Sequence, residues 1–187
     1  MLASIAVPSC RGSLAPEALR RQAPGENSRL QRWRRKLEPF VRPVAHFYWR
    51  FSRGATLGAR GMVIDRDGRV FLIKHSYIDG WHLPGGGVET GETMLTALAR
   101  ELVEEGNIVV TGAPALHGIF FNGRVSRRDH VALYIVREFR QDEAPTPGRE
   151  IIAHGFFAPD ALPEDTSRAT RARIAEVFNG APLSEKW

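Results

Sequence analysis

The stretch from Gly85 to Ile108, GGGVETGETMLTALARELVEEGNI, constrains the fold of this chain more than any other. Its leading glycines let the backbone approach another group closely, in conformations that a side chain would block. The helix expected after them carries Glu101, Glu104 and Glu105 within about 100° of arc, so three carboxylates converge on one face. Like charges at this spacing repel one another, and we therefore expect a cation between them. Oxygen ligands of this kind favour Mg²⁺, with Mn²⁺ possible, over zinc.

The same helix is expected to be amphipathic. Leu95, Leu98 and Leu102 lie about a quarter-turn away from the carboxylates, which predicts an apolar face that packs inward while the carboxylates stay at the rim. Gly91 and Glu92 are expected to open the helix.

These residues resemble the signature of the Nudix hydrolases, position by position. That signature runs Gly, five residues, Glu, seven residues, then Arg-Glu-aliphatic-any-Glu-Glu-any-Gly-aliphatic. It is met at Gly86, Glu92, Arg100, Glu101, Leu102, Glu104, Glu105 and Ile108.

One position departs from the signature. Asn107 stands where the family has a glycine, and Gly106 fills the preceding free position. Because Asn and Gly most readily adopt the left-handed conformation that ends a helix, we expect the helix to stop at Asn107 or one residue earlier.

The resemblance implies a fold and an activity. Residues 56–180, about two-thirds of the chain, are expected to form the Nudix α/β/α sandwich with a mixed sheet. The implied reaction is Mg²⁺-dependent hydrolysis of a diphosphate linkage in a nucleoside diphosphate joined to another group, with release of a nucleoside monophosphate. The substrate is thus a small nucleotide.

The resemblance also implies roles for individual residues. Glu101, Glu104 and Glu105 are expected to bind the metal, with the Gly85 carbonyl completing its shell, and Glu101 is also able to take a proton from the attacking water. Arg100 is expected to orient these carboxylates, and Glu92 to pair with Arg100 or bind the metal through water. The loop before the last strand often supplies a further catalytic carboxylate, for which Glu150 is better placed than Glu143. The backbone at Gly86 and Gly87 is expected to lie near substrate.

An alternative from another class of protein is a Nudix-fold sensor that binds a nucleotide without cleaving it. The intact set of glutamates argues against this interpretation, because a sensor can lose metal ligands without penalty.

Charge is distributed unevenly along the chain. Residues 1–60 contain 12 lysines and arginines against 3 acidic residues, a net charge of +9, and residues 61–187 contain 14 against 18, a net charge of −4. The acidic remainder argues against a catalytic part that binds nucleic acid generally. The single cysteine, Cys10, excludes an intrachain disulfide and is typical of a reducing compartment, so we expect a cytoplasmic protein.

The chain before residue 56 lies outside the resemblance. Residues 1–28 are expected to be a disordered tail, with a mitochondrial targeting sequence as the alternative. Residues 29–55 are predicted to form a basic amphipathic helical extension. We expect this extension to pack on the domain or on a second subunit, forming a homodimer, in preference to a membrane surface or RNA. Residues 181–187 are expected to be a C-terminal tail.

Strands are predicted on both sides of the central helix. The runs at 61–65 and 70–75 surround an Asp-Gly turn, which is typical of a hairpin. The run at 130–139 alternates, with Val131, Leu133 and Ile135 on one side. A closing helix is expected after an N-cap at Asp165 or Thr166, with an apolar stripe at Ile174, Val177 and Phe178.

For two further groups of side chains, the sequence allows more than one role. Arg124, Arg127 and Arg128 lie in one turn and either bind substrate phosphates or form a solvated hairpin tip. His75 and His82 are interpreted as rim or core residues, since a carboxylate site needs neither.

Overall fold

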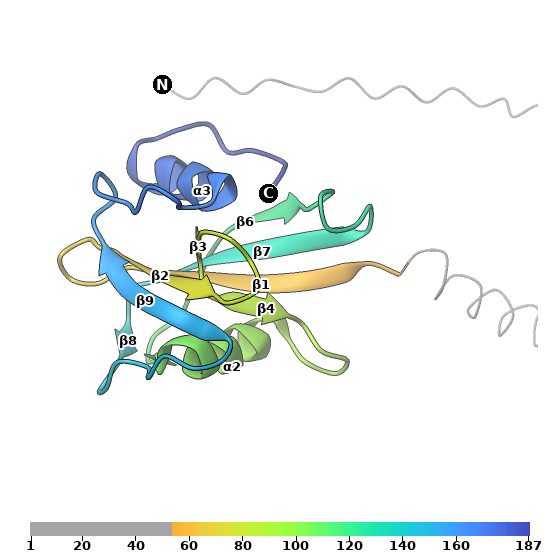
Figure 1. The fold of residues 1–187 in the computed structure, drawn as a ribbon. Coiled ribbons are helices and arrows are strands. Elements are labelled where there is room, and N and C mark those ends of the chain that lie inside the picture. The colour runs from red at the N-terminus through yellow and green to blue at the C-terminus, as the bar shows by residue number, and fades with distance from the viewer. Residues whose placement is uncertain (1–53) are drawn as a thin grey trace, which may run out of the picture. The chain divides into compact units, whose positions relative to one another are not determined.

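The four-stranded sheet at the centre of the fold has the order β4-β1-β7-β6 (Figure 1). Strands β1 (Thr56–Val63) and β7 (Asp129–Val136) pair in parallel along their whole length. Strand β4 (Gly85–Gly87) pairs antiparallel with β1, and β6 (Ala115–Phe121) pairs antiparallel with β7. The computed structural model describes residues 54–187, so the predictions for residues 1–28 and for almost all of 29–55 lie outside the described residues.

Two smaller sheets complete the strands. Strand β2 (Val70–His75) pairs antiparallel with both β3 (Trp81–His82) and β9 (Ile151–Phe157). Strands β5 (Val109–Val110) and β8 (Phe139–Arg140) form an antiparallel pair. Pairing between β2 and β9 brings the residue before β9, Glu150, to the end of β2.

The predicted Asp-Gly turn is present, but the hairpin around it extends over a single antiparallel bridge. Asp65 accepts hydrogen bonds from the backbone N–H groups of Asp67 and Arg69, and Gly68 adopts a φ of 76°. Only the bridge between Ile64 and Val70 joins the two strands. Away from this bridge, β1 belongs to the four-stranded sheet and β2 to the three-stranded sheet. The Asp-Gly pair determines the local turn, but it does not determine which strands pair over a longer range.

Helix α2 (Met94–Gly106) begins later than the sequence suggested. Its N-cap is Thr93, whose Oγ1 accepts a hydrogen bond from the Thr96 N–H at 3.1 Å, and not Gly91 or Glu92. The predicted end is confirmed. Asn107 adopts the left-handed conformation, with φ 49° and ψ 31°, and its N–H donates to Val103 O at 3.0 Å.

The buried face of α2 is rotated from the one predicted. Leu98 and Leu102 are fully buried, but Leu95 is 48% exposed, so its inclusion in the packing face is wrong. Met94 packs against the core, and Glu105 is buried. The buried arc is therefore centred near Leu98 and Glu105, which are seven residues and two turns apart, and Leu95 lies at its margin.

Both faces of β7 are buried, where the sequence predicted one. Val131 and Leu133 face one side, as expected, but Ala132, Tyr134 and Val136 are also buried. Ala132, Tyr134 and Val136 belong to the core beneath α2, and Leu133 to the core beneath α3 (Arg168–Phe178). Figure 1 shows the two helices on opposite sides of the strands. The predicted α/β/α sandwich with a mixed sheet is confirmed.

Helix α3 carries the apolar stripe predicted for it, since Ile174 is buried and Val177 and Phe178 pack on the same core. The predicted N-caps are wrong. The Asp165 carboxylate binds Lys74 Nζ at 2.7 Å, and Thr166 Oγ1 donates to the Pro163 carbonyl.

Because both side chains are engaged elsewhere, the cap of α3 is the next residue, Ser167. Its Oγ accepts a hydrogen bond from the Thr170 N–H at 3.2 Å. The helix start therefore depends on contacts to β2 and to a preceding turn.

The segment 181–187, which we assigned to a tail, packs on the domain. Phe121 N–H donates to Glu185 O at 2.8 Å, and Trp187 N–H donates to Phe121 O at 3.1 Å. The Trp187 ring meets the Phe120 ring edge-on at 5.7 Å. No helix within residues 54–187 is long and apolar enough to cross a membrane.

Candidate active site

The glycine turn, which is the short strand β4 (Gly85–Gly87), contacts both β1 and α2. Gly85 has a φ of 133°, and a Cβ there would lie 2.7 Å from Arg60 Cα, so this position requires glycine. Its N–H donates to Glu105 Oε2 at 2.6 Å. The turn and the helix thus hold each other through one backbone-to-carboxylate bond.

Glu105 is the buried carboxylate of the helix. Its side chain is 10% exposed, and burial raises its pKa to about 7, although the Gly85 hydrogen bond and Arg60 oppose that shift. His75 Nε2 lies 3.7 Å from Glu105 Oε1, and burial lowers the pKa of His75. The neutral imidazole does not compensate the carboxylate, so a bound cation would favour its charged form.

Arg100 joins the acidic residues around α2. Its Nε donates to Glu92 Oε1 at 3.0 Å, and its Nη1 donates to Glu101 Oε1 at 2.8 Å. The same Nη1 lies 3.4 Å from Glu104 Oε2, and Nη2 donates to Gly87 O at 3.2 Å. Hydrogen bonds from Arg100 lower the pKa of Glu92. These are the contacts that an orienting role for Arg100 and a supporting role for Glu92 require.

A pocket of about 200 Å³ opens above this arrangement. Three carboxylates line it, from Glu101, Glu105 and Glu150. Glu150 is exposed, and Tyr77 Oη donates to its Oε1 at 3.1 Å. The other lining residues are Arg60, His75, Tyr77, Ile78, His82, Gly85 and Gly86.

Glu104 does not line this pocket, because its side chain is 58% exposed and turned towards Arg100. Within residues 54–187, no group of three or more acidic, His or Cys side chains is gathered as a ready metal site. The pocket's acidic donors still fit a hard divalent ion, since they are carboxylate oxygens and one of them is buried with a raised pKa. Glu101 Oε1 accepts from Arg100 Nη1, so Arg100 and a bound ion would share this carboxylate.

The sequence interpretation missed Arg60, which lines the pocket from β1. Its Nη1 donates to Leu83 O at 2.7 Å, and burial lowers its pKa against the opposing charges of Glu105 and Glu101. A signal was present in the sequence, because Arg60 is the one charged residue in the strand TLGARGMV. His75 and His82, interpreted as rim or core residues, both line the pocket.

A second cavity, of about 790 Å³, lies beside the basic turn between β6 and β7, and the three arginines of this turn differ in their relation to it. Arg124 lines this cavity, whereas Arg127 and Arg128 do not. Glu143 is exposed and lines neither pocket.

Comparison with known proteins identifies the class to which this fold and pocket belong. The model of the NUDIX domain matches residues 55–178, and the chain belongs to the Nudix family. A MutT-like protein of Streptomyces ambofaciens is 30% identical over 126 residues, which are 67% of this chain and 79% of that protein. A putative 8-oxo-dGTP diphosphatase of Bacillus subtilis is 25% identical, over 67% of this chain and 82% of that protein.

A solved structure supports the same assignment. The MutT NUDIX hydrolase of Burkholderia pseudomallei has a TM-score of 0.58 and 27% identity, covering 67% of this chain and 99% of that one. The protein is therefore an enzyme of the Nudix hydrolase class, with pyrophosphohydrolase activity on small-molecule nucleotides. Enzymes of this family use divalent metal ions.

Proposed function

We propose that this enzyme uses Mg²⁺ to hydrolyse the diphosphate linkage of a nucleoside diphosphate joined to another group, and releases a nucleoside monophosphate. The observation that carries the proposal is the pocket in which buried Glu105 meets Glu101 and Glu150. Burial raises the pKa of Glu105 to about 7 because its negative charge is poorly solvated there. A bound divalent cation would compensate that charge and so favour the ionised carboxylate.

The acidic side chains would hold the ion. Glu101 and Glu105, which line the pocket, are proposed as ligands together with Glu104, which would have to turn towards the pocket, and the Gly85 carbonyl adds a further oxygen. Carboxylate and carbonyl oxygens of this kind would favour Mg²⁺, and Mn²⁺ would accept the same donors. The ion, when bound, offsets the phosphate charge and lowers the pKa of the attacking water.

Side chains of the pocket would manage the reacting proton. Glu101 accepts the proton of the attacking water, whose oxygen bonds to phosphorus. The bridging P–O bond breaks, and its electron pair stays on the oxygen of the leaving phosphate. Glu150, which Tyr77 holds at the rim, is the second candidate for the proton acceptor.

The remaining residues would position these groups. Arg100 holds Glu101 and Glu104, while Glu92 holds Arg100. The backbone of Gly86 makes room for the Glu101 carboxylate, and the open space beside Gly87 is the proposed place for a substrate phosphate.

The test is product analysis on a panel of ADP-sugars, NADH, dinucleoside polyphosphates and nucleoside triphosphates, with Mg²⁺ or Mn²⁺. We expect monophosphate release that requires the metal, and a loss of roughly 100-fold or more in Glu105→Gln. Glu164→Gln, on the exposed turn before α3, is the matched control and should keep full activity.

The alternative, a sensor that binds nucleotides without cleaving them, predicts a different result. Wild type, Glu104→Gln and Glu105→Gln would then be equally inactive on the whole panel while wild type still binds a nucleotide. That outcome would overturn the hydrolase proposal.

A further inference from the structure

The larger cavity adjoins the carboxylate pocket. The two share Arg60, Ile78 and His82 in their walls, so the larger space begins beside the carboxylate pocket. Its volume of about 790 Å³ exceeds that of the carboxylate pocket several-fold and is typical of a small-molecule site.

Resting on the proposed hydrolysis, we propose that Arg60, Arg124 and Arg168 bind a phosphate group beyond the hydrolysed linkage. The preferred substrates are then nucleotides with at least three consecutive phosphates, in preference to a nucleoside diphosphate joined to an uncharged sugar.

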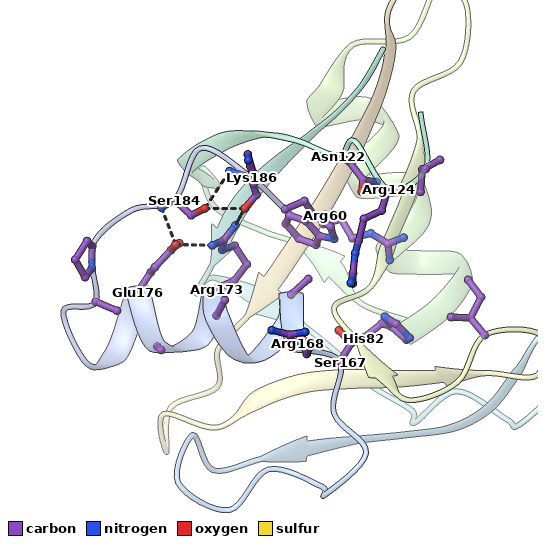
Figure 2. Close-up of a pocket in the computed structure, with 18 residues that line it drawn as sticks. Arg60, His82, Asn122, Arg124, Ser167, Arg168, Arg173, Glu176, Ser184 and Lys186 are labelled. Carbon is purple, nitrogen blue, oxygen red and sulfur yellow. Dashed lines mark hydrogen bonds and ion pairs between the residues drawn. The ribbon is translucent and has the colours of Figure 1, made fainter. Parts of the chain in front are cut away.

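The three arginines come from three separate elements. Arg60 lies in β1, Arg124 in the β6–β7 turn, and Arg168 is the first residue of α3. Figure 2 shows the Arg60 and Arg124 side chains directed into the same space, with Arg168 and His82 across it.

Backbone pairing places Arg168 at this end of the cavity. Trp81 N–H donates to Asp165 O at 3.2 Å, and Ser167 N–H donates to Trp81 O at 3.1 Å. The start of α3 is thereby fixed beside β3 and next to His82. Gly80, with a φ of 93°, leaves no room for a Cβ against Asp165, which permits this close approach.

The β6–β7 turn that carries Arg124 is also held in place. Asn122 Nδ2 donates to Asp129 Oδ2 at 2.8 Å, and Val125 N–H donates to Asn122 O at 3.1 Å. Asn122 itself lines the cavity. The turn is therefore anchored at its base, with Arg124 above it.

Positive charge predominates at the end of the cavity that Arg60, Arg124 and Arg168 line. Within residues 54–187, Glu176 is the only acidic residue that lines the cavity, and Glu176 is engaged at the far end. It pairs with Arg173 Nη2 at 2.5 Å and with His117 Nε2 at 3.1 Å, and it accepts from Ser184 N–H at 2.9 Å.

Within residues 54–187, neither Arg124 nor Arg168 forms an ion pair with an acidic side chain. A planar guanidinium matches two phosphate oxygens at once, so a phosphate group would satisfy this end of the cavity and an uncharged sugar would not.

Kinetics on two substrates with the same adenosine test this assignment. Wild type is expected to show a kcat/KM for ATP at least about tenfold above that for ADP-ribose. The double variant Arg124→Gln/Arg168→Gln changes two exposed side chains, so it should fold. We expect it to lose roughly 10- to 100-fold in kcat/KM for ATP and less than about twofold for ADP-ribose.

The control is Arg66→Gln/Arg137→Gln, which removes the same charge from two exposed positions that line neither pocket. It should behave as wild type on both substrates. Equal losses on ATP and ADP-ribose in the Arg124/Arg168 variant, or no loss on either, would overturn the proposal.

A binding measurement separates this proposal from the proposed function. Calorimetry with inorganic tripolyphosphate requires no hydrolysis, and the Arg124/Arg168 variant should bind it at least about tenfold more weakly than wild type. Unchanged binding rejects the phosphate site even in an active hydrolase. An inactive wild type whose tripolyphosphate binding depends on these arginines rejects the hydrolase proposal and retains the site.

Discussion

The carboxylate of Glu101 lies directly against the backbone of Gly86, such that a Cβ at Gly86 would stand 2.6 Å from Glu101 Cδ. Gly86→Ala should therefore displace Glu101 while leaving the fold intact, because the obstructing atoms are the end of a flexible side chain. We expect kcat/KM to fall by roughly 10- to 100-fold and the free energy of unfolding to change by less than about 1 kcal/mol.

The matched control for Gly86 is Gly148→Ala, where an added Cβ meets nothing within 4 Å. Steady-state assays and urea unfolding of both variants provide the comparison. Full activity in Gly86→Ala would show that the position of Glu101 does not matter to the reaction.

The raised pKa of Glu105 predicts how stability depends on pH. The pKa is about 7 in the folded protein against an ordinary value of 4.5, so folding favours the protonated carboxyl. This contribution is fully present below pH 4.5 and is lost as pH rises through 7, a change of about 3 kcal/mol at most. Without metal, the free energy of unfolding should fall over this range in wild type and vary much less in Glu105→Gln.

Urea unfolding in EDTA at several pH values between 5 and 8 measures this difference. His75 acts with the opposite sign, because its lowered pKa removes stability as pH falls through its ordinary range, but it is present in both proteins. Mg²⁺ should raise the stability of wild type at pH 8 more than that of Glu105→Gln. Parallel pH profiles for the two proteins would contradict the assignment of Glu105 as the buried carboxyl that titrates.

Arg100→Lys tests whether the guanidinium orients the carboxylates. Arg100 reaches Glu92 through Nε and Nη2 and Glu101 through Nη1, and a single ammonium cannot span these acceptors in the same geometry. We expect the apparent affinity for the divalent ion to fall by roughly 10- to 100-fold, measured by titrating activity with Mg²⁺ and by calorimetry with Mn²⁺.

The control for Arg100 is Arg69→Lys, which alters a surface arginine paired with Asp65 and Asp67. It should leave metal affinity unchanged. An identical Mg²⁺ dependence in Arg100→Lys and wild type would remove the orienting role.

The structural features that lie within one continuous segment of the chain could be predicted from the sequence. The glycine turn, the helix after it and its end at Asn107 depend on local backbone preferences and on side-chain spacing. The inward position of Glu105 was missed because the apolar arc was drawn through the leucines alone, whereas Met94 shifts its centre towards Glu105.

Residues brought together by distant pairing could not be predicted from spacing. Glu150 reaches the pocket because β9 pairs with β2, and Tyr77 then donates to it across 73 positions of sequence. Arg60 enters through the pairing of β1 with β4, and Arg168 through the contacts of residues 165–167 with Trp81. Such register depends on the packing of the whole domain.

Asn107, the one departure from the family signature, offers a test that separates stability from catalysis. Its φ of 49° is unfavourable for residues with a Cβ, least so for Asn, and glycine tolerates it freely. Asn107→Ala should lower the free energy of unfolding by about 1 kcal/mol, and Asn107→Gly should match or slightly exceed wild type. Urea unfolding with Mg²⁺ present measures both, and activity well below the unfolding midpoint should change little in either, since Asn107 does not line the carboxylate pocket. If Asn107→Ala proved as stable as Asn107→Gly, the left-handed helix end would not be what this position provides.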